Sequence, residues 1–294
     1  MRIMLRNCFS CKRLSFVDDN PGGLFREKTE LKSVVAGMSP SGIIGGSGIW
    51  IMPSYINHSC WPNSVRSFLG DLLIVRAARD IQEGEEITMN YLDNESCLQN
   101  RQEELYSGWG FNCKCTLCEI ETAESQEVQN KRQELMDKAS NFETYLKRPL
   151  KKTNSGIAPL IVLIKGIEAT YTKPEFIQPR VQLISPADIL QTFLVRAERL
   201  SDVSLLAKEA LNGLGFKITT REGKVVIERY GYMSYPVMQL FVRVITAEAM
   251  VGDLLTATLW KDAAVGVYEV LGGEKESFFD AFGTVLSGVG VPFD

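Results

Sequence analysis

Residues 57–63 read Asn-His-Ser-Cys-Trp-Pro-Asn, and they hold the only histidine in a chain of 294 residues. His58 stands two positions before Cys60, a spacing that suits three different interpretations. The two side chains form a metal-ligand pair, a nucleophile with its base, or two buried residues without chemistry of their own. The rest of the chain has to decide among them.

A cysteine cluster lies downstream, where residues 113–118 read Cys-Lys-Cys-Thr-Leu-Cys. Structural zinc takes four ligands in a tetrahedron, with Zn–S bonds of about 2.3 Å. The cluster therefore predicts a four-cysteine zinc site whose fourth ligand comes from elsewhere; the alternative is a catalytic metal with water in the fourth position. Spacing leaves that ligand open among Cys8, Cys11, Cys60 and Cys97. Cys8 and Cys11 form a C-x2-C pair without a complementary second pair, which favours two small apolar residues over a second zinc site.

The composition indicates a soluble globular chain, with 45% hydrophobic residues and a net charge of −4. An acidic balance argues against direct nucleic-acid binding and is compatible with a lysine-rich substrate. The longest apolar run, residues 157–164, is too short to cross a membrane. The first residues lack the apolar core of a secretory signal, and seven cysteines in such a chain favour thiols and metal sites over disulfides. We expect an intracellular protein, in the nucleus, the cytoplasm or both.

Up to about residue 120 the pattern is typical of short strands and turns. Residues 65–69 and 72–77 are β-rich and separated by Gly70-Asp71, a two-residue hairpin signal. A second pair of strand segments, around Ile81 and at 86–91, is predicted to join through Glu83-Gly84.

Helices are predicted where apolar residues recur every three or four positions. A short one covers residues 96–106 and ends at Gly108. Beyond residue 120, Leu135, Ala139, Phe142 and Leu146 fall on one helical face. Further helices are expected from Ser185, which would be the N-cap, and at 201–213, 237–250 and 254–271, with a small hairpin at 216–229. The fold class is therefore α+β, with a strand-rich domain at 1–120 and an α-helical array of helical hairpins at 121–294.

Three motifs carry a family resemblance through their order: SYINHSCWPN at 54–63, RAARDIQEGEEITMNY at 76–91 and RQEELYSGWGFNCKCTLC at 101–118. This order resembles the C-terminal half of a SET domain followed by its post-SET zinc element. The version is similar to SET-and-MYND proteins and fungal SET proteins with a tetratricopeptide-like helical region. Together with NCFSC at 7–11, the resemblance covers roughly residues 5–120 and implies a partial SET-type β-clip of short strands.

The resemblance also implies roles for single residues. Asn57 and His58 would hold S-adenosylmethionine, and Phe111 would pack on this cofactor or on the lysine channel. Tyr91 would be the active-site tyrosine. Cys60 would complete the zinc site of Cys113, Cys115 and Cys118. The acidic run at 83–86 is interpreted as a solvated turn, and Tyr55, Trp61 and Trp109 as packing residues.

The implied activity is protein-lysine N-methyltransferase, acting on a lysine-containing protein, with histones among the candidates. The glycine-containing motif that opens a SET domain is not recognisable before residue 57, so the sequence also suggests a fragment or truncated form. A non-catalytic, zinc-stabilised module that binds a protein partner through its helices is the alternative. A weaker one is an unrelated zinc-ribbon adaptor.

Overall fold

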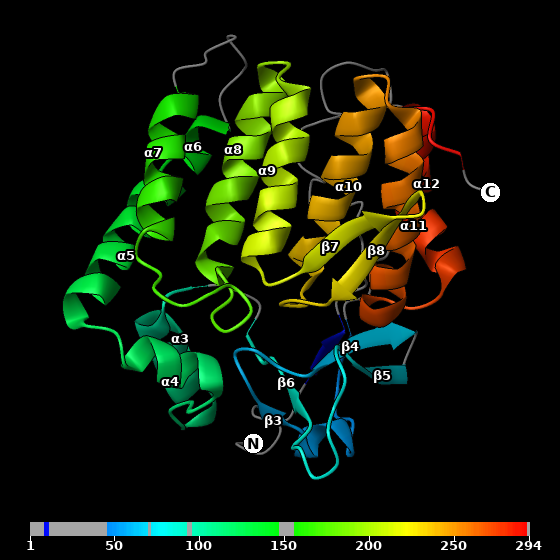
Figure 1. Ribbon diagram of the computed structural model, residues 1–294. Helices are drawn as coiled ribbons and strands as arrows, with labels where there is room; N and C mark the ends of the chain where they lie inside the picture. Colours follow the sequence, from blue (N-terminus) through cyan, green and yellow to red (C-terminus); the bar gives the residue numbers. More distant parts are fainter. Residues whose placement is uncertain (1–8, 12–45, 70–71, 93–95, 147–155, 293–294) are drawn as a thin grey trace.

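The computed structural model describes residues 9–11, 46–69, 72–92, 96–146 and 156–292. The short strands of residues 57–89 lie at the bottom of Figure 1, below a row of helices formed by residues 157–288, and the strand hairpin of residues 217–229 lies beside the last of these helices. The predicted α+β class is therefore confirmed. The predictions for Cys8, Gly70-Asp71 and the NCFSC stretch fall partly or wholly outside the described residues.

The strands pair in small two-stranded sheets. They are β1 (Phe9–Cys11) with β2 (Gly46–Gly48), β3 (Asn57–His58) with β6 (Thr88–Met89), β4 (Ser64–Leu69) with β5 (Leu72–Ala77), and β7 (Lys217–Arg221) with β8 (Lys224–Arg229). The 3-10 turn η1 (Pro53–Tyr55) precedes β3. The antiparallel register of β4 and β5 confirms the first predicted hairpin, and that of β7 and β8 confirms the last.

The second predicted strand pair, around Ile81 and at 86–91, is wrong. Gly84 does adopt a turn conformation with φ 80°, but only Thr88–Met89 is extended, and it pairs in parallel with β3. The reason is a side chain: the carboxamide of Asn63 accepts from the Thr88 N–H at 2.9 Å and donates to the Glu86 carbonyl at 2.9 Å. These bonds replace a neighbouring strand.

Helices dominate the chain after β6. They are α3 (Leu98–Trp109), α4 (Thr116–Thr122), α5 (Gln126–Ser140), α6 (Glu143–Leu146), α7 (Ile157–Glu168), α8 (Ile184–Arg196), α9 (Leu200–Gly213), α10 (Tyr235–Met250), α11 (Leu254–Leu271) and α12 (Lys275–Gly288), with the 3-10 turn η3 (Val181–Leu183) before α8. The predicted helices at 201–213, 237–250 and 254–271 are confirmed within two residues.

Two helix ends differ from the prediction. Helix α3 continues past Gly108 to Trp109 and is capped by Gly110, whose φ of 79° lets its N–H return to the carbonyls of Leu105 and Tyr106. Ser185 does not cap α8, because η3 leads directly into the helix and Ser185 lies within its first turn. The apolar face predicted through Leu146 is divided between α5 and α6.

One apolar core joins the strand region to the helices. Cys60 and Leu105 are buried in the same cluster as Phe241 of α10 and Trp260 of α11. Hydrogen bonds reinforce this contact, since the Tyr235 hydroxyl donates to the Arg66 carbonyl at 2.9 Å. The domain division near residue 120 stays a prediction, because these contacts cross it. A second cluster fills the space between α5, α7, α8 and α9.

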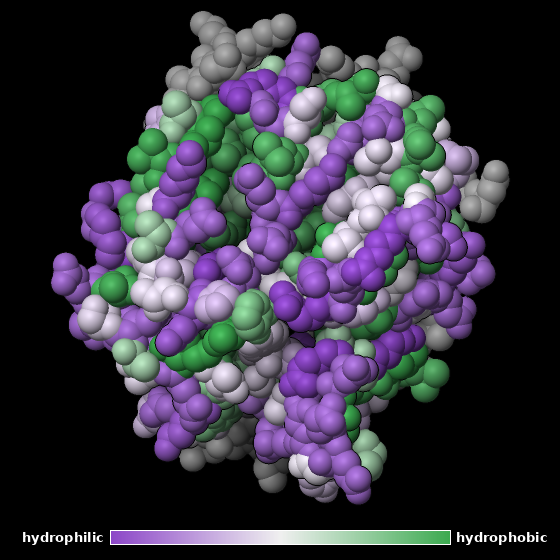
Figure 2. Space-filling view, in the orientation of Figure 1, coloured by the Kyte–Doolittle hydropathy of each residue, from purple (hydrophilic) through white to green (hydrophobic). Residues whose placement is uncertain are grey.

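The surface shows no membrane-spanning feature among the described helices, since none is both long and apolar enough to cross a bilayer. Hydrophilic side chains cover much of the visible face around the β7–β8 hairpin (Figure 2). Apolar ones gather over α7, where Val162 is exposed.

Candidate functional site

The tertiary fold brings four cysteine sulfurs together. Cys60 follows β3, Cys113 and Cys115 precede α4, and Cys118 lies within α4; their sulfur atoms all lie within 4.8 Å of one another. All four are free thiols. A tetrahedron with Zn–S bonds of about 2.3 Å has sulfurs roughly 3.8 Å apart, so the spacing fits such an ion. Among the candidates left open by spacing, Cys60 joins the cluster, whereas Cys97 lies outside it.

The four thiols behave as one electrostatic unit. Hydrogen bonds with Cys113, Cys115 and Cys118 raise the pKa of Cys60, and hydrogen bonds with Cys115 and Cys118 lower the pKa of Cys113. The side chain of Arg101 lies beside the cluster, with its Nη2 at 3.9 Å from the Cys118 sulfur. The arrangement favours a cation, because four close thiolates repel one another unless a positive charge separates them.

A buried ionic network links this cluster to the helical region. Arg101 pairs with Glu121, which also accepts from the Gln182 amide at 2.9 Å and lies 4.0 Å from Arg132. Arg132 makes a two-pronged ion pair with Glu124, with both N–O distances 2.8 Å. Burial opposes the charge on Arg101, but the Glu121 carboxylate and the sulfurs of Cys60 and Cys118 together outweigh it and raise the Arg101 pKa. Helices α3 and α4 are therefore joined to α5 by ion pairs and to η3 by the Gln182 hydrogen bond.

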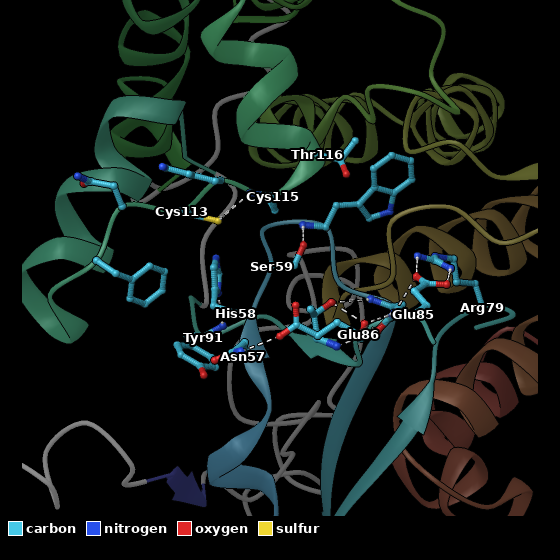
Figure 3. Close-up of a pocket in the computed structure, with 16 residues that line it drawn as sticks. Asn57, His58, Ser59, Arg79, Glu85, Glu86, Tyr91, Cys113, Cys115 and Thr116 are labelled. Atoms are coloured by element: carbon cyan, nitrogen blue, oxygen red, sulfur yellow. Dashed lines mark hydrogen bonds and ion pairs between the residues drawn. The ribbon is translucent and has the colours of Figure 1, made fainter. Parts of the chain in front are cut away.

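A cavity of about 470 Å³ opens next to the cysteines (Figure 3). Its wall combines amide, acidic, basic and aromatic side chains from segments far apart in the chain. The lining residues are Asn57, His58, Ser59, Trp61, Asn63, Arg79, Glu85, Glu86, Thr88, Tyr91, Phe111, Asn112, Cys113, Lys114, Cys115 and Thr116. The predicted residues Asn57, His58, Tyr91 and Phe111 are thus brought to one cavity, and two of the cluster cysteines form part of its wall.

His58 and Tyr91 lie against each other on one side of this cavity (Figure 3), with ring centroids 5.2 Å apart. The Tyr91 hydroxyl donates to the Ile56 carbonyl at 2.6 Å. Burial raises the Tyr91 pKa against the opposing effect of Arg66, with a smaller rise from Glu86, so the phenol stays protonated at neutral pH. Phe111 lies 6.1 Å from His58, and Trp109 lies 5.3 Å from Tyr91, each measured between ring centroids.

The acidic run at 83–86 does more than form a solvated turn. Glu85 accepts from Arg79 and from the Asn63 amide, and these bonds lower its pKa to about 2. Glu86 accepts from the Asn57 amide at 2.7 Å. The two carboxylates do diverge toward different partners, as expected for a turn, yet both line the cavity.

Sequence reasoning missed several lining residues. Trp61 was interpreted as a packing residue, and Arg79, Lys114 and Thr116 carried no prediction. Their positions follow from the parallel pairing of β3 with β6 and from the cysteine cluster, which together bring three separate segments to one place. One sequence feature could have indicated part of this wall: the acidic run at 83–86 directly precedes the strand of Thr88 and Met89, which pairs with the strand of Asn57 and His58.

Comparisons with known proteins agree with this geometry. Residues 16–92 match the SET domain family. A protein named "Methyltransferase" from Gibberella zeae is 30% identical over 243 residues, covering 79% of this chain and 32% of that protein. Histone-lysine N-methyltransferase SET5 of Yarrowia lipolytica is 41% identical over 81 residues, and histone-lysine N-methyltransferase SMYD3 of Homo sapiens is 40% identical over 76 residues.

These alignments cover only part of each relative. The SET5 match spans 27% of this chain and 18% of SET5, and the SMYD3 match spans 26% of this chain and 18% of SMYD3. The chain thus spans about a third of the Gibberella protein and less than a fifth of the other two. The family match, the motif order and the fold agree: residues 16–92 are similar to the SET domain family, and the chain, which continues into a helical C-terminal region, is similar to SET- and SMYD-type methyltransferases.

Proposed function

We propose that the cavity binds S-adenosylmethionine and that the protein transfers its methyl group to the ε-amine of a lysine in a protein substrate. The observation that carries this proposal is the meeting of Asn57, His58, Tyr91 and Phe111 around one cavity beside four cysteines. The relatives named as histone-lysine N-methyltransferases support the substrate class. A nuclear or cytoplasmic location is the matching expectation.

Zinc is the proposed occupant of the cysteine cluster. Four thiolates with no open position are typical of structural rather than catalytic zinc. Cys60 and the segment of Cys113, Cys115 and Cys118 would then be tied together, which would hold one wall of the cavity in place. The ionic network of Arg101 and Glu121 extends that wall to the helices.

The cavity suits a nucleoside-containing cofactor in size and chemistry. Ligand pockets are commonly about 300–1,000 Å³ and combine apolar walls with a few polar groups. Asn57 and His58 would hold the cofactor, and the Phe111 ring would pack against it. When bound, S-adenosylmethionine supplies a methyl group on a positively charged sulfur.

Tyr91 would orient the substrate lysine. Because its hydroxyl proton is directed at the Ile56 carbonyl, the phenolic oxygen keeps its lone pairs for an incoming N–H. An amine that donates to this oxygen has its own lone pair held in a defined direction. Burial and a neighbouring positive charge both lower a lysine pKa, which favours the neutral amine required for attack. Alignment of the two reacting groups contributes much of the remaining rate.

One contact favours a second candidate, a non-catalytic SET-derived module that binds zinc and a protein partner. The Asn57 amide already donates to Glu86 at 2.7 Å, a bond that cofactor binding would have to exchange. If that bond persists, the cavity would not accept the cofactor, and the zinc-stabilised scaffold with its helices would serve binding alone.

Calorimetry separates the two candidates. The zinc-loaded chain is titrated with S-adenosylmethionine, next to the variants Asn57→Ala and Asn130→Ala, the latter an exposed control on α5. The enzyme proposal expects binding that weakens in Asn57→Ala and persists in Asn130→Ala, together with transfer of labelled methyl groups to a lysine-containing protein such as a histone. Zinc binding without any cofactor binding would support the interaction module.

A further inference from the structure

The imidazole of His58 has both ring nitrogens engaged within the protein. Its Nδ1 lies 3.0 Å from the backbone nitrogen of Tyr91, and its Nε2 lies 3.2 Å from the sulfur of Cys60. The side chain is 8% exposed, so water competes little for either nitrogen. One ring thus spans from the proposed active-site tyrosine to a proposed zinc ligand.

The two contacts assign the protons. A backbone N–H is always a donor, so Nδ1 of His58 must accept from Tyr91 and carries no hydrogen. In the neutral ring the hydrogen then sits on Nε2, which donates to the Cys60 sulfur. A donor next to a thiolate makes a charge-assisted hydrogen bond, which is stronger than one to a neutral acceptor.

The contact to Tyr91 continues the strand pairing. The parallel pairing of β3 with β6 ends at His58 and Met89, and the Ser59 N–H still bonds to the Met89 carbonyl at 3.0 Å. Two residues after Met89, the N–H of Tyr91 takes the imidazole as its acceptor. The position of the Tyr91 backbone, and with it the hydroxyl directed at Ile56, therefore depends on the ring.

We propose that His58 is a positioning residue that couples the metal site to the tyrosine: Nε2–H steadies the Cys60 thiolate while Nδ1 holds the backbone of Tyr91. This inference rests on the proposed zinc site and methyl transfer, and it adds a role for the imidazole that is separate from contact with the cofactor. Donors of this kind orient metal ligands, and their removal commonly weakens metal binding about 10- to 100-fold.

Two variants of His58 each keep one of its two hydrogen bonds and remove the other. The amide nitrogen of His58→Gln reaches the place of Nε2 and can donate to Cys60, but it offers nothing to Tyr91. The amide oxygen of His58→Asn reaches the place of Nδ1 and can accept from Tyr91, but it leaves Cys60 without a donor. Zinc affinity is measured by chelator competition, the cobalt(II)-loaded chain gives the sulfur-to-metal charge-transfer band, and hydrogen exchange reports the Tyr91 amide.

A crossed pattern is expected. His58→Asn should bind zinc about 10- to 100-fold more weakly, shift the cobalt band and keep the Tyr91 amide protected. His58→Gln should keep zinc affinity within about threefold, expose the Tyr91 amide to exchange and lower kcat more than it changes KM. Equal losses in both variants, or unchanged zinc affinity in His58→Asn, would overturn the proposal.

The wild-type chain provides a test that needs no variant. Because His58 is the only histidine, its ring nitrogens are identified in a nitrogen-15 spectrum without further assignment. The zinc-loaded chain should show a hydrogen on Nε2 and none on Nδ1; a hydrogen on Nδ1 would refute the coupling. The zinc, cobalt, hydrogen-exchange and nitrogen-15 readouts do not require turnover, so an inactive chain that shows the crossed pattern in them would refute methyl transfer alone.

Discussion

The hydroxyl of Tyr91 donates to the backbone carbonyl of Ile56 across 2.6 Å, and this bond fixes which way the phenol points. Tyr91 comes from the segment after β6, whereas Ile56 immediately precedes β3. The parallel pairing of those two strands holds the donor and the acceptor together. The oxygen that would meet a substrate amine is therefore oriented before any substrate arrives.

Replacing Tyr91 by Phe should reduce methyl transfer far more than stability. The lost hydrogen bond is worth about 0.5–1.5 kcal/mol, while a misoriented lysine costs about 100-fold or more in kcat. Steady-state kinetics and thermal unfolding measure the two effects. Tyr106→Phe, at an exposed position on α3, is the control and should leave both unchanged. Near wild-type turnover in Tyr91→Phe would remove this residue from the mechanism.

Loss of a cluster cysteine should release the metal and destabilise the chain. Cys118→Ser replaces a buried thiolate with a weaker ligand, so metal analysis should fall from equimolar zinc to little, and a chelator should no longer lower Tm. Cys97→Ser changes a buried cysteine outside the cluster and should retain the metal. Equal zinc content in the two variants would contradict the assignment of Cys118.

Removing the carboxylate of Glu121 should be strongly destabilising. Glu121→Ala leaves the buried Arg101 without its carboxylate partner, which costs about 3–5 kcal/mol for a buried pair, while Arg132 keeps its ion pair with Glu124. Glu119→Ala, on the same helix and exposed, should change the free energy of unfolding by less than about 0.5 kcal/mol. Urea denaturation of both variants gives the comparison. A small effect at Glu121 would show that water or another carboxylate compensates Arg101.

Cys97 should resist alkylation until the pH is high. Burial, with a smaller effect of Glu121, raises its pKa from 9.0 to about 11. Because the folded-state pKa lies above the unfolded value, the neutral thiol contributes stability below pH 9, and this contribution is lost as the pH rises through 11. Mass spectrometry after iodoacetamide treatment should show slow modification at pH 8, increasing up to about pH 11. A rate at pH 8 equal to that of a free small thiol would disprove the shift.

Substitution by alanine should have opposite effects on stability at Gly231 and at Gly266. A Cβ at Gly231 would lie 2.3 Å from the Leu214 carbonyl oxygen and 2.6 Å from the Phe216 nitrogen, both backbone atoms that cannot turn aside. Gly231→Ala should therefore lower the free energy of unfolding by about 1–3 kcal/mol. A Cβ at Gly266 in α11 would meet nothing within 4 Å, so Gly266→Ala should stabilise the helix by up to about 1 kcal/mol. The urea midpoints of the pair should move in opposite directions.

Local patterns predicted much of the fold because they depend on neighbours in the sequence. The apolar spacing of the later helices and the alternation in the β4–β5 and β7–β8 hairpins were sufficient to locate those elements. The strand pair expected around Ile81 failed because the Asn63 side chain, far away in sequence, takes the hydrogen bonds of that segment. The end of α3 could not be read from the sequence, because Gly108 and Gly110 are both suitable capping residues and only hydrogen bonding in the folded chain selects Gly110. The start of α8 likewise depends on the preceding turn η3, which the Ser185-Pro186 pair does not reveal.

By itself, the sequence determined the order of the three motifs and the short spacing of Cys113, Cys115 and Cys118, which were enough to indicate the family and a zinc cluster. The tertiary structure brings Cys60 to the other three cysteines, as the family resemblance implies, whereas spacing alone left it open. Only the tertiary structure decided that Glu85 and Glu86 line the cavity. It also decided that both nitrogens of His58 are engaged. A thiol cluster within six residues is a short-range property of the chain. A hydrogen bond across the β3–β6 pair exists only once folding has brought two remote segments within 3 Å of each other.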